Sequence, residues 1–241
     1  MNKKFAFLIL PFIIFTTPLP GQSKVTIFTI GSYNSFSMTD LKQLQQELLN
    51  DMRTTGVPAR IVESYPSFYG FKGGFLIPVQ QNETSLFSMG GIAEYTSAGG
   101  RVHYQDYSGE LRADEIAAVW SFGGIMEYRT NPDNIFCVSF QATSRIFFSM
   151  LKYTLVTQVG NSSKTQEMQF HSLSFGLEPG IVPTFKCYDF QLGLSLSYLL
   201  FIPKNLQFDE NSKADLRNNK GSQVTIDWSG YRIGILLGYS F

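Results

Sequence analysis

The sequence is poor in charged residues and in the residues that bind metals. Asp, Glu, Lys and Arg make up 16% of its 241 residues, against roughly 25% in soluble domains. The formal net charge is 0, which gives no electrostatic case for nucleic-acid binding. The two cysteines and two histidines form no CxxC or Cys/His cluster. The sequence therefore predicts no structural zinc site and no cofactor.

Long apolar runs are also missing. After residue 23 no segment is an apolar run of 18 residues, whereas a transmembrane helix needs about 20. Aromatic residues, in contrast, are abundant, with 22 Phe and 12 Tyr. A membrane protein without such helices must be a closed β-barrel, because lipid cannot satisfy open backbone groups. The competing class is a soluble β-sandwich, whose strands also alternate apolar and polar residues and are joined by many turns.

The last eleven residues, 231–241, favour the barrel. One strand face carries only apolar residues: Tyr231, Ile233, Ile235, Leu237, Tyr239 and Phe241. The other face carries Arg232, three small or polar residues (Gly234, Gly238 and Ser240) and one Leu. A period of two with an apolar outer face and a polar inner face describes a strand between lipid and a polar lumen.

This segment resembles the C-terminal strand of Gram-negative outer-membrane β-barrels, which ends on an aromatic residue that serves as an assembly signal. The resemblance implies that Tyr239 and Phe241 are the signal and that the barrel-assembly machinery inserts the chain from the periplasm. It also implies contact with outer-membrane lipid and lipopolysaccharide. It implies no single activity, because that family is functionally mixed.

The N-terminus has the layout of a secretory signal peptide. Lys3 and Lys4 precede an apolar run over residues 5–15, and small and turn-forming residues follow over 16–23. We expect cleavage after Ser23, which leaves residues 24–241 as the barrel domain in the outer membrane. The alternative is a buried N-terminal helix, which Pro11, Pro18 and Pro20 would break.

The alternation predicts eight strands. Seven are clear, over residues 67–79, 85–97, 114–129, 135–155, 168–185, 190–201 and 224–241. An even count requires another strand before them, and residues 25–35 are the candidate. Short connections (80–84, 130–134 and 186–189) alternate with long ones (98–113, 157–167 and 202–223). That alternation is typical of periplasmic turns and extracellular loops.

One amphipathic helix is predicted over residues 37–55. Ser37 and Asp40 resemble a capping box, and leucines at helical spacing form an apolar stripe. We expect this stripe to pack on the barrel mouth or to enter the lumen as a plug. The alternatives are binding to the membrane interface and docking on a partner.

Six charged residues occupy inward positions: Lys72, Glu94, Glu127, Arg145, Glu178 and Arg232. Charges of opposite sign in a lumen this narrow are expected to pair and to block it. The alternative is a narrow polar conduit or a site for a small ligand.

Two further sets of residues have weaker support from the sequence. His103, Asp106 and Ser108 lie in one predicted loop and resemble the parts of a hydrolase site, although such sites are recognised by geometry. Cys137 and Cys187 both fall near the periplasmic rim. An exported protein permits a disulfide between them if their Cα atoms lie within about 7 Å.

The sequence thus predicts a non-enzymatic outer-membrane barrel. Its role is structural or adhesive, or that of an accessory subunit in a larger envelope complex. The second hypothesis is a narrow pore or small-ligand transporter. The third is a lipid-modifying hydrolase or acyltransferase at the outer rim.

Overall fold

The computed structural model describes residues 24–107, 109–209 and 211–241. The predicted signal peptide (residues 1–23) and Ser108 lie outside the described residues.

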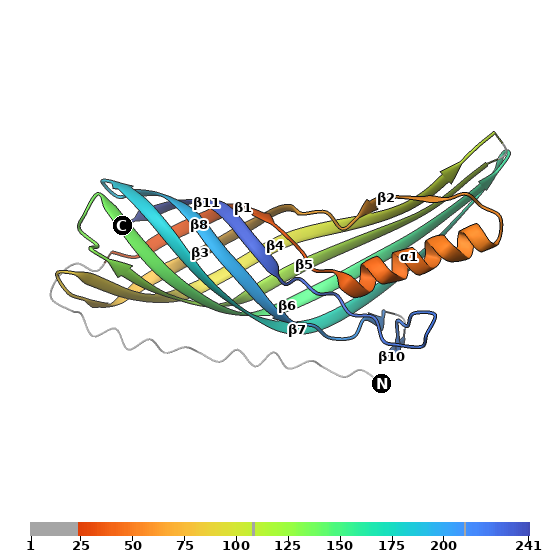
Figure 1. The fold of residues 1–241 in the computed structure, drawn as a ribbon. Helices are drawn as coiled ribbons and strands as arrows, with labels where there is room; N and C mark the ends of the chain where they lie inside the picture. Colours follow the sequence, from red (N-terminus) through yellow and green to blue (C-terminus); the bar gives the residue numbers. More distant parts are fainter. Residues whose placement is uncertain (1–23, 108, 210) are drawn as a thin grey trace.

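Eight antiparallel strands close into a ring, which confirms the predicted all-β barrel (Figure 1). The ring closes because β1 pairs with β3 on one side and with β11 on the other, while β11 also pairs with β8. Its strands are β1 (Thr26–Asn34), β3 (Phe68–Gln81), β4 (Ser85–Gln105), β5 (Gly109–Thr130), β6 (Phe136–Val159), β7 (Ser162–Cys187), β8 (Phe190–Ile202) and β11 (Gly230–Ser240). The predicted first strand, residues 25–35, is therefore present as β1.

The two ends of the ring differ. The tight turns that join β3 to β4, β5 to β6 and β7 to β8 gather at the end that holds the C-terminus (Figure 1). We call this the turn end. The opposite end, the loop end, carries the connections from β1 to β3 and from β8 to β11.

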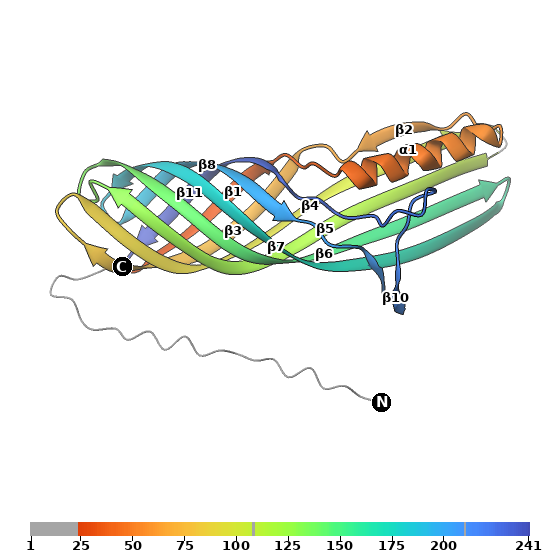
Figure 2. The ribbon, with the colours of Figure 1, turned by 60° about the horizontal axis from the view of Figure 1, so that its bottom comes forward.

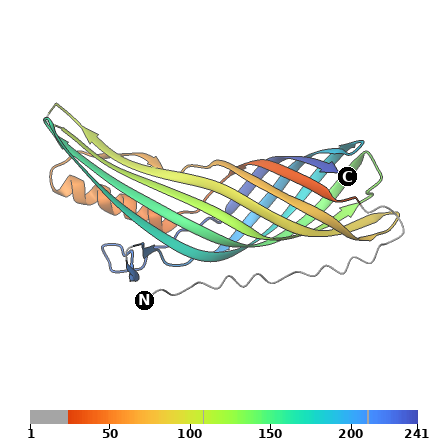
Figure 3. The same ribbon diagram turned by 180° about the vertical axis from the view of Figure 1, so that it is seen from behind.

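Strands β4 to β7 continue beyond the ring at the loop end (Figure 3). Strands β4 to β7 contain 21, 22, 24 and 26 residues, whereas β1 contains 9. The predicted long loops 98–113 and 157–167 are therefore wrong, because their residues stay paired almost to the hairpin tips. The predicted strand 224–241 is too long, since β11 begins at Gly230.

A helix and a short strand cover part of these extended strands (Figure 2). Helix α1 (Thr39–Thr54) buries Leu41, Gln45, Leu49 and Met52, and β2 (Arg60–Ser64) pairs with β4. We call residues 99–115 and 153–168, with α1 and β2, the projection. The projection holds together because one face of the extended strands is apolar where it meets α1.

The predicted capping box does not form. Met38, at the N-cap, adopts a left-handed conformation and makes no side-chain cap. Asp40 instead accepts hydrogen bonds from the backbone N–H and the hydroxyl of Thr225, at 3.1 and 2.7 Å. Asp40 thus joins α1 to the connection between β8 and β11. That connection also contains β9 (Gln207–Phe208) and β10 (Asn211–Asp215).

The outer surface of the ring is an apolar belt. Burial alternates residue by residue along the strands, most regularly in β1 and β11. The exposed positions carry large apolar side chains, among them Trp120, Phe122, Phe140, Ile146, Phe148, Leu194, Leu196 and Ile235. In the part of the chain that the structure describes, no helix has the length and apolarity to cross a membrane. The belt is the surface expected of strands that face lipid.

Candidate functional site

Five charged side chains meet inside the ring. This ionic cluster consists of Lys72, Glu94, Arg145, Glu178 and Arg232. The Arg145 guanidinium donates to both carboxylates, one through each terminal nitrogen. Arg232 donates to Glu94, and Lys72 donates to Glu178. All five are buried, so the cluster pairs three cations with two carboxylates away from water.

The period of two explains how the cluster forms. Its members come from β3, β4, β6, β7 and β11, and each occupies an inward position of its strand. Lys72 and Glu94 are direct cross-strand partners. Arg145 also donates to the Ser121 hydroxyl at 3.2 Å, and its guanidinium carbon lies 5.1 Å from the centre of the Phe147 ring. The cluster is therefore held by several strands at once.

Glu127, the sixth predicted member, does not join the cluster. Its carboxylate lies 2.8 Å from Arg129 and accepts a hydrogen bond from Gln141 at 2.7 Å. Ile125 lies between Glu127 and the cluster on the same inward face of β5. Arg129 was not predicted as a partner, although its position two residues after Glu127, on the same inward face, was the available signal.

An apolar layer closes the lumen on the turn side of the ionic cluster. Ile92 precedes Glu94 on β4, and Leu236 follows Arg232 on β11. These two belong to one packed group with Phe28, Ile30, Leu76, Ile125 and Val182. The layer separates the ionic cluster from the pair of Glu127 and Arg129.

A second apolar layer fills the mouth at the loop end. Strand residues such as Phe147 and Leu199 pack there against Phe36, Leu41 and Trp228 from the connections. The Trp228 indole N–H donates to the Ser149 hydroxyl at 2.9 Å, and its ring meets Phe36 edge to face. The first turn of α1 thus contributes to the closure, while the rest of the helix lies on the projection.

A buried polar pair fixes the base of the projection. The Tyr65 hydroxyl donates to the Glu115 carboxylate, and both residues are buried. Burial and the neighbouring carboxylate raise the pKa of Tyr65, so this hydroxyl keeps its proton and remains a donor. Gln45 of α1 donates to the Glu63 carbonyl at 2.7 Å. These contacts could not be predicted from the sequence, because they join segments far apart in the chain.

Charged side chains line the outer face of the projection beside the apolar belt. Arg101 and Arg112 both pair with Asp114, the latter at 3.1 Å. Lys152 pairs with Glu167 at 2.9 Å. The change from apolar to charged side chains marks the border of the belt on these strands.

The structure describes two of the three candidate catalytic residues, His103 and Asp106. The Nε2 atom of His103 lies 3.3 Å from the Glu110 carboxylate, and the Tyr104 hydroxyl donates to Asp106 at 2.6 Å. Residue 108, the third candidate, is not described. The residues that are described contain no group of three or more His, Cys, Asp or Glu able to hold a metal ion.

The disulfide considered above is absent, and both cysteines are free thiols. Cys137 is buried and donates weakly to the Thr184 carbonyl at 3.8 Å. Cys187 is exposed at the turn end. Cys137 is in register with Thr184, three residues from Cys187, so the two side chains occupy different places on the rim.

The predicted assembly signal lies at the turn end. The ring of Tyr239 packs against Phe190 and stacks on Phe241, with centroids 5.0 and 6.2 Å apart. The backbones of Phe241 and Val25 exchange two hydrogen bonds. The exposed Phe241 ring is thus available at the rim.

No protein-family model and no curated protein matches the chain. Three solved structures that resemble it are Ail, the attachment invasion locus protein of Yersinia pestis, solved with the heparin analogue sucrose octasulfate; OprG, an outer membrane protein of Pseudomonas aeruginosa; and Neisserial surface protein A. Ail is 12% identical, with 91% of this chain and 99% of Ail covered and a TM-score of 0.39. OprG is 10% identical (91% and 96% covered, TM-score 0.34), and the Neisserial protein is 11% identical (90% and 97%, TM-score 0.30).

At these identities and TM-scores the likenesses carry no argument about this chain, and no residue role is transferred. The closed ring, the apolar belt and the tight turns at one end are themselves the features of a small outer-membrane β-barrel. The chain has that fold.

Proposed function

We propose that this chain is an integral outer-membrane β-barrel protein in which the ring is a closed membrane anchor and the projection is the working surface. Its role is non-enzymatic. It is either a structural or adhesive barrel or an accessory subunit of a larger envelope complex. The projection faces outward from the cell, and the turn end faces the periplasm.

The packed interior of the ring is the observation that carries this proposal. The ionic cluster lies between two apolar layers, and all of these side chains are buried. An eight-stranded barrel is only just wide enough for its own side chains. Opening a path would require breaking buried ion pairs, which costs about 3–5 kcal/mol for each uncompensated charge. The pore hypothesis requires that opening, whereas an anchor does not.

With the interior of the ring filled, we propose the projection as the surface that carries the function. Its strands continue the barrel wall without a hinge, and α1 and β2 brace them. Such a support holds outward-facing side chains in fixed positions, as a binding surface requires. Lipopolysaccharide and outer-membrane lipid are the partners we propose for the charged border of the belt, with the barrel-assembly machinery as the partner during insertion.

Labelling of intact cells tests the orientation. In a Cys187→Ser background, Gln158→Cys places a thiol at the tip of the projection, and Asn82→Cys places one at the turn end. We expect a membrane-impermeant maleimide to label the first in intact cells and the second only after the outer membrane is disrupted. The reverse pattern, or fractionation of the mature chain into the inner membrane or periplasm, would refute the proposal. Co-purification in mild detergent then separates an accessory subunit from a free-standing barrel.

A further inference from the structure

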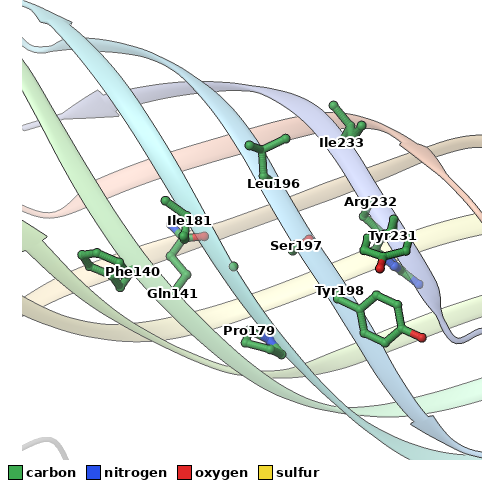
Figure 4. Close-up of a pocket in the computed structure, with 11 residues that line it drawn as sticks. Phe140, Gln141, Pro179, Ile181, Leu196, Ser197, Tyr198, Tyr231, Arg232 and Ile233 are labelled. Carbon is green, nitrogen blue, oxygen red and sulfur yellow. The ribbon is translucent and has the colours of Figure 1, made fainter.

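The outer wall of the ring contains a groove across β6, β7, β8 and β11 (Figure 4). Its volume is about 620 Å³, within the range of roughly 300–1,000 Å³ that is usual for small-molecule sites. The groove lies on the apolar belt, outside the lumen. Two residues of its floor, Ser197 and Arg232, turn their side chains inward and donate to Glu178 and Glu94 of the ionic cluster.

Strand register explains the shape of the groove. Its floor follows one cross-strand row, in which Gly180 pairs with Gln141 on one side and Ser197 on the other, and Ser197 pairs with Arg232. The floor residues point inward, so their backbone forms the floor. The side chains of the neighbouring rows on each side form the walls.

Both walls are apolar or aromatic. One wall is the continuous row Phe140, Ile181, Leu196 and Ile233. The other contains Pro179, Tyr198 and Tyr231, and the two tyrosine rings meet edge to face with centroids 4.8 Å apart. Pro179 has no backbone N–H to donate to a neighbouring strand, and it has no partner among the described residues of β8.

The groove slants across the membrane. Tyr231 is the first outward residue of β11 at the loop end, whereas Phe140 lies close to the start of β6 at the turn end. With strands about 4.8 Å apart, the axes of β6 and β11 are separated by roughly 14 Å. Because barrel strands tilt by about 35–45°, roughly 8–10 Å of that length lies along the membrane normal, which fits within one leaflet of a hydrocarbon core about 30 Å thick.

We propose that this groove is a lipid-binding site that holds one acyl chain of an outer-leaflet lipid as a long-lived ligand. The chain lies along the Phe140 row, with its polar end beside the hydroxyls of Tyr198 and Tyr231 and its methyl end toward Phe140. Tyrosine suits the polar end, because its ring is apolar and its hydroxyl prefers the water interface. Continuity with the lipid-facing belt selects an acyl chain as the occupant. The inference rests on the proposed membrane insertion.

Two tryptophan substitutions on the same strand test the site. Leu196→Trp adds a ring inside the groove, whereas Leu194→Trp adds the same ring one outward position away, outside the residues that line it. The two leucines are matched, with exposures of 42% and 44%. Each full-length barrel is reconstituted into dipalmitoyl phosphatidylethanolamine vesicles and extracted in mild detergent. Native mass spectrometry then counts the lipids that remain bound.

The expected result is one retained lipid on the wild-type and Leu194→Trp barrels and at least about fivefold lower occupancy on Leu196→Trp. Equal retention by all three proteins would overturn the inference. A dimer mass in place of bound lipid would also overturn it, since the groove would then face a second copy. Failure of membrane insertion itself is read separately from heat-modifiable gel migration, and that result would count against the proposed function as well.

Discussion

The charge balance of the ionic cluster predicts which of two substitutions, Arg145→Met or Glu94→Gln, destabilises the barrel more. Arg145 touches both carboxylates, but removing it with Arg145→Met leaves Glu94 with Arg232 and Glu178 with Lys72. Two cations then face two carboxylates. Glu94→Gln is different, because it leaves three cations with one carboxylate. We therefore expect Glu94→Gln to be the more damaging change, even though it preserves the shape of the side chain.

The burial of Arg145 and Glu94 determines how much unfolding free energy each variant loses. Both side chains are 1% exposed, so water and salt do not screen the change. An uncompensated buried charge costs about 3–5 kcal/mol, which is the expected loss of unfolding free energy for Glu94→Gln. For Arg145→Met, hydrogen bonds are lost but no ion is left without a partner, and we expect about 1–3 kcal/mol. The double variant, Arg145→Met with Glu94→Gln, has one cation in excess, as the wild-type cluster has. Its loss of unfolding free energy should therefore be smaller than the sum of the two single losses by about 0.5–3 kcal/mol.

Urea unfolding in lipid vesicles measures these changes, with tryptophan fluorescence and heat-modifiable migration as two probes of the same transition. Glu83→Gln, at the exposed turn between β3 and β4, is the control for removing a carboxylate away from the cluster. A larger loss for Arg145→Met than for Glu94→Gln, or simple addition of the two effects in the double variant, would refute this prediction.

Three further predictions concern other parts of the molecule. Phe241→Ala should lower the yield of folded, heat-modifiable barrel more than Leu194→Ala, because only the former removes the predicted assembly signal; equal yields would reject that role. In the folded barrel Cys187 should react with a maleimide while Cys137 reacts only after denaturation, and a thiol count below two in the denatured, non-reduced protein would contradict this. The pKa of Glu47 is lowered, first because its carboxylate accepts a backbone N–H from the connection between β8 and β11. That contact is therefore present above the ordinary glutamate pKa and is lost as the pH falls through the lowered pKa, so the protection of amides in this connection, relative to their intrinsic exchange rate at each pH, should fall in acid; unchanged protection would argue against it.

The sequence predicted the ring because its alternation has a direct physical cause. Lipid outside and side-chain packing inside impose a period of two on every strand, and this period is visible from residue 231 to Phe241. The same phase identified five members of the ionic cluster. It could not show that Glu127 turns to Arg129, because that choice depends on which layers the inward side chains form once the ring is closed.

The projection was harder to predict. Residues 98–113 contain charges and glycines, and outside the belt both faces of a strand accept polar side chains. The apolar positions Val102 and Ala113 belong to its core, but they become informative only once α1 is known to cover them. The pair of Tyr65 and Glu115 likewise depends on contacts between distant segments.

Single-channel recording of the purified protein in planar bilayers tests the central claim most directly. If the ionic cluster and its two apolar layers close the lumen, the wild-type protein should give no stable conductance steps across a range of voltages and salts. Reproducible, ion-selective steps from the wild-type protein would contradict the closed anchor and make the narrow pore the leading hypothesis.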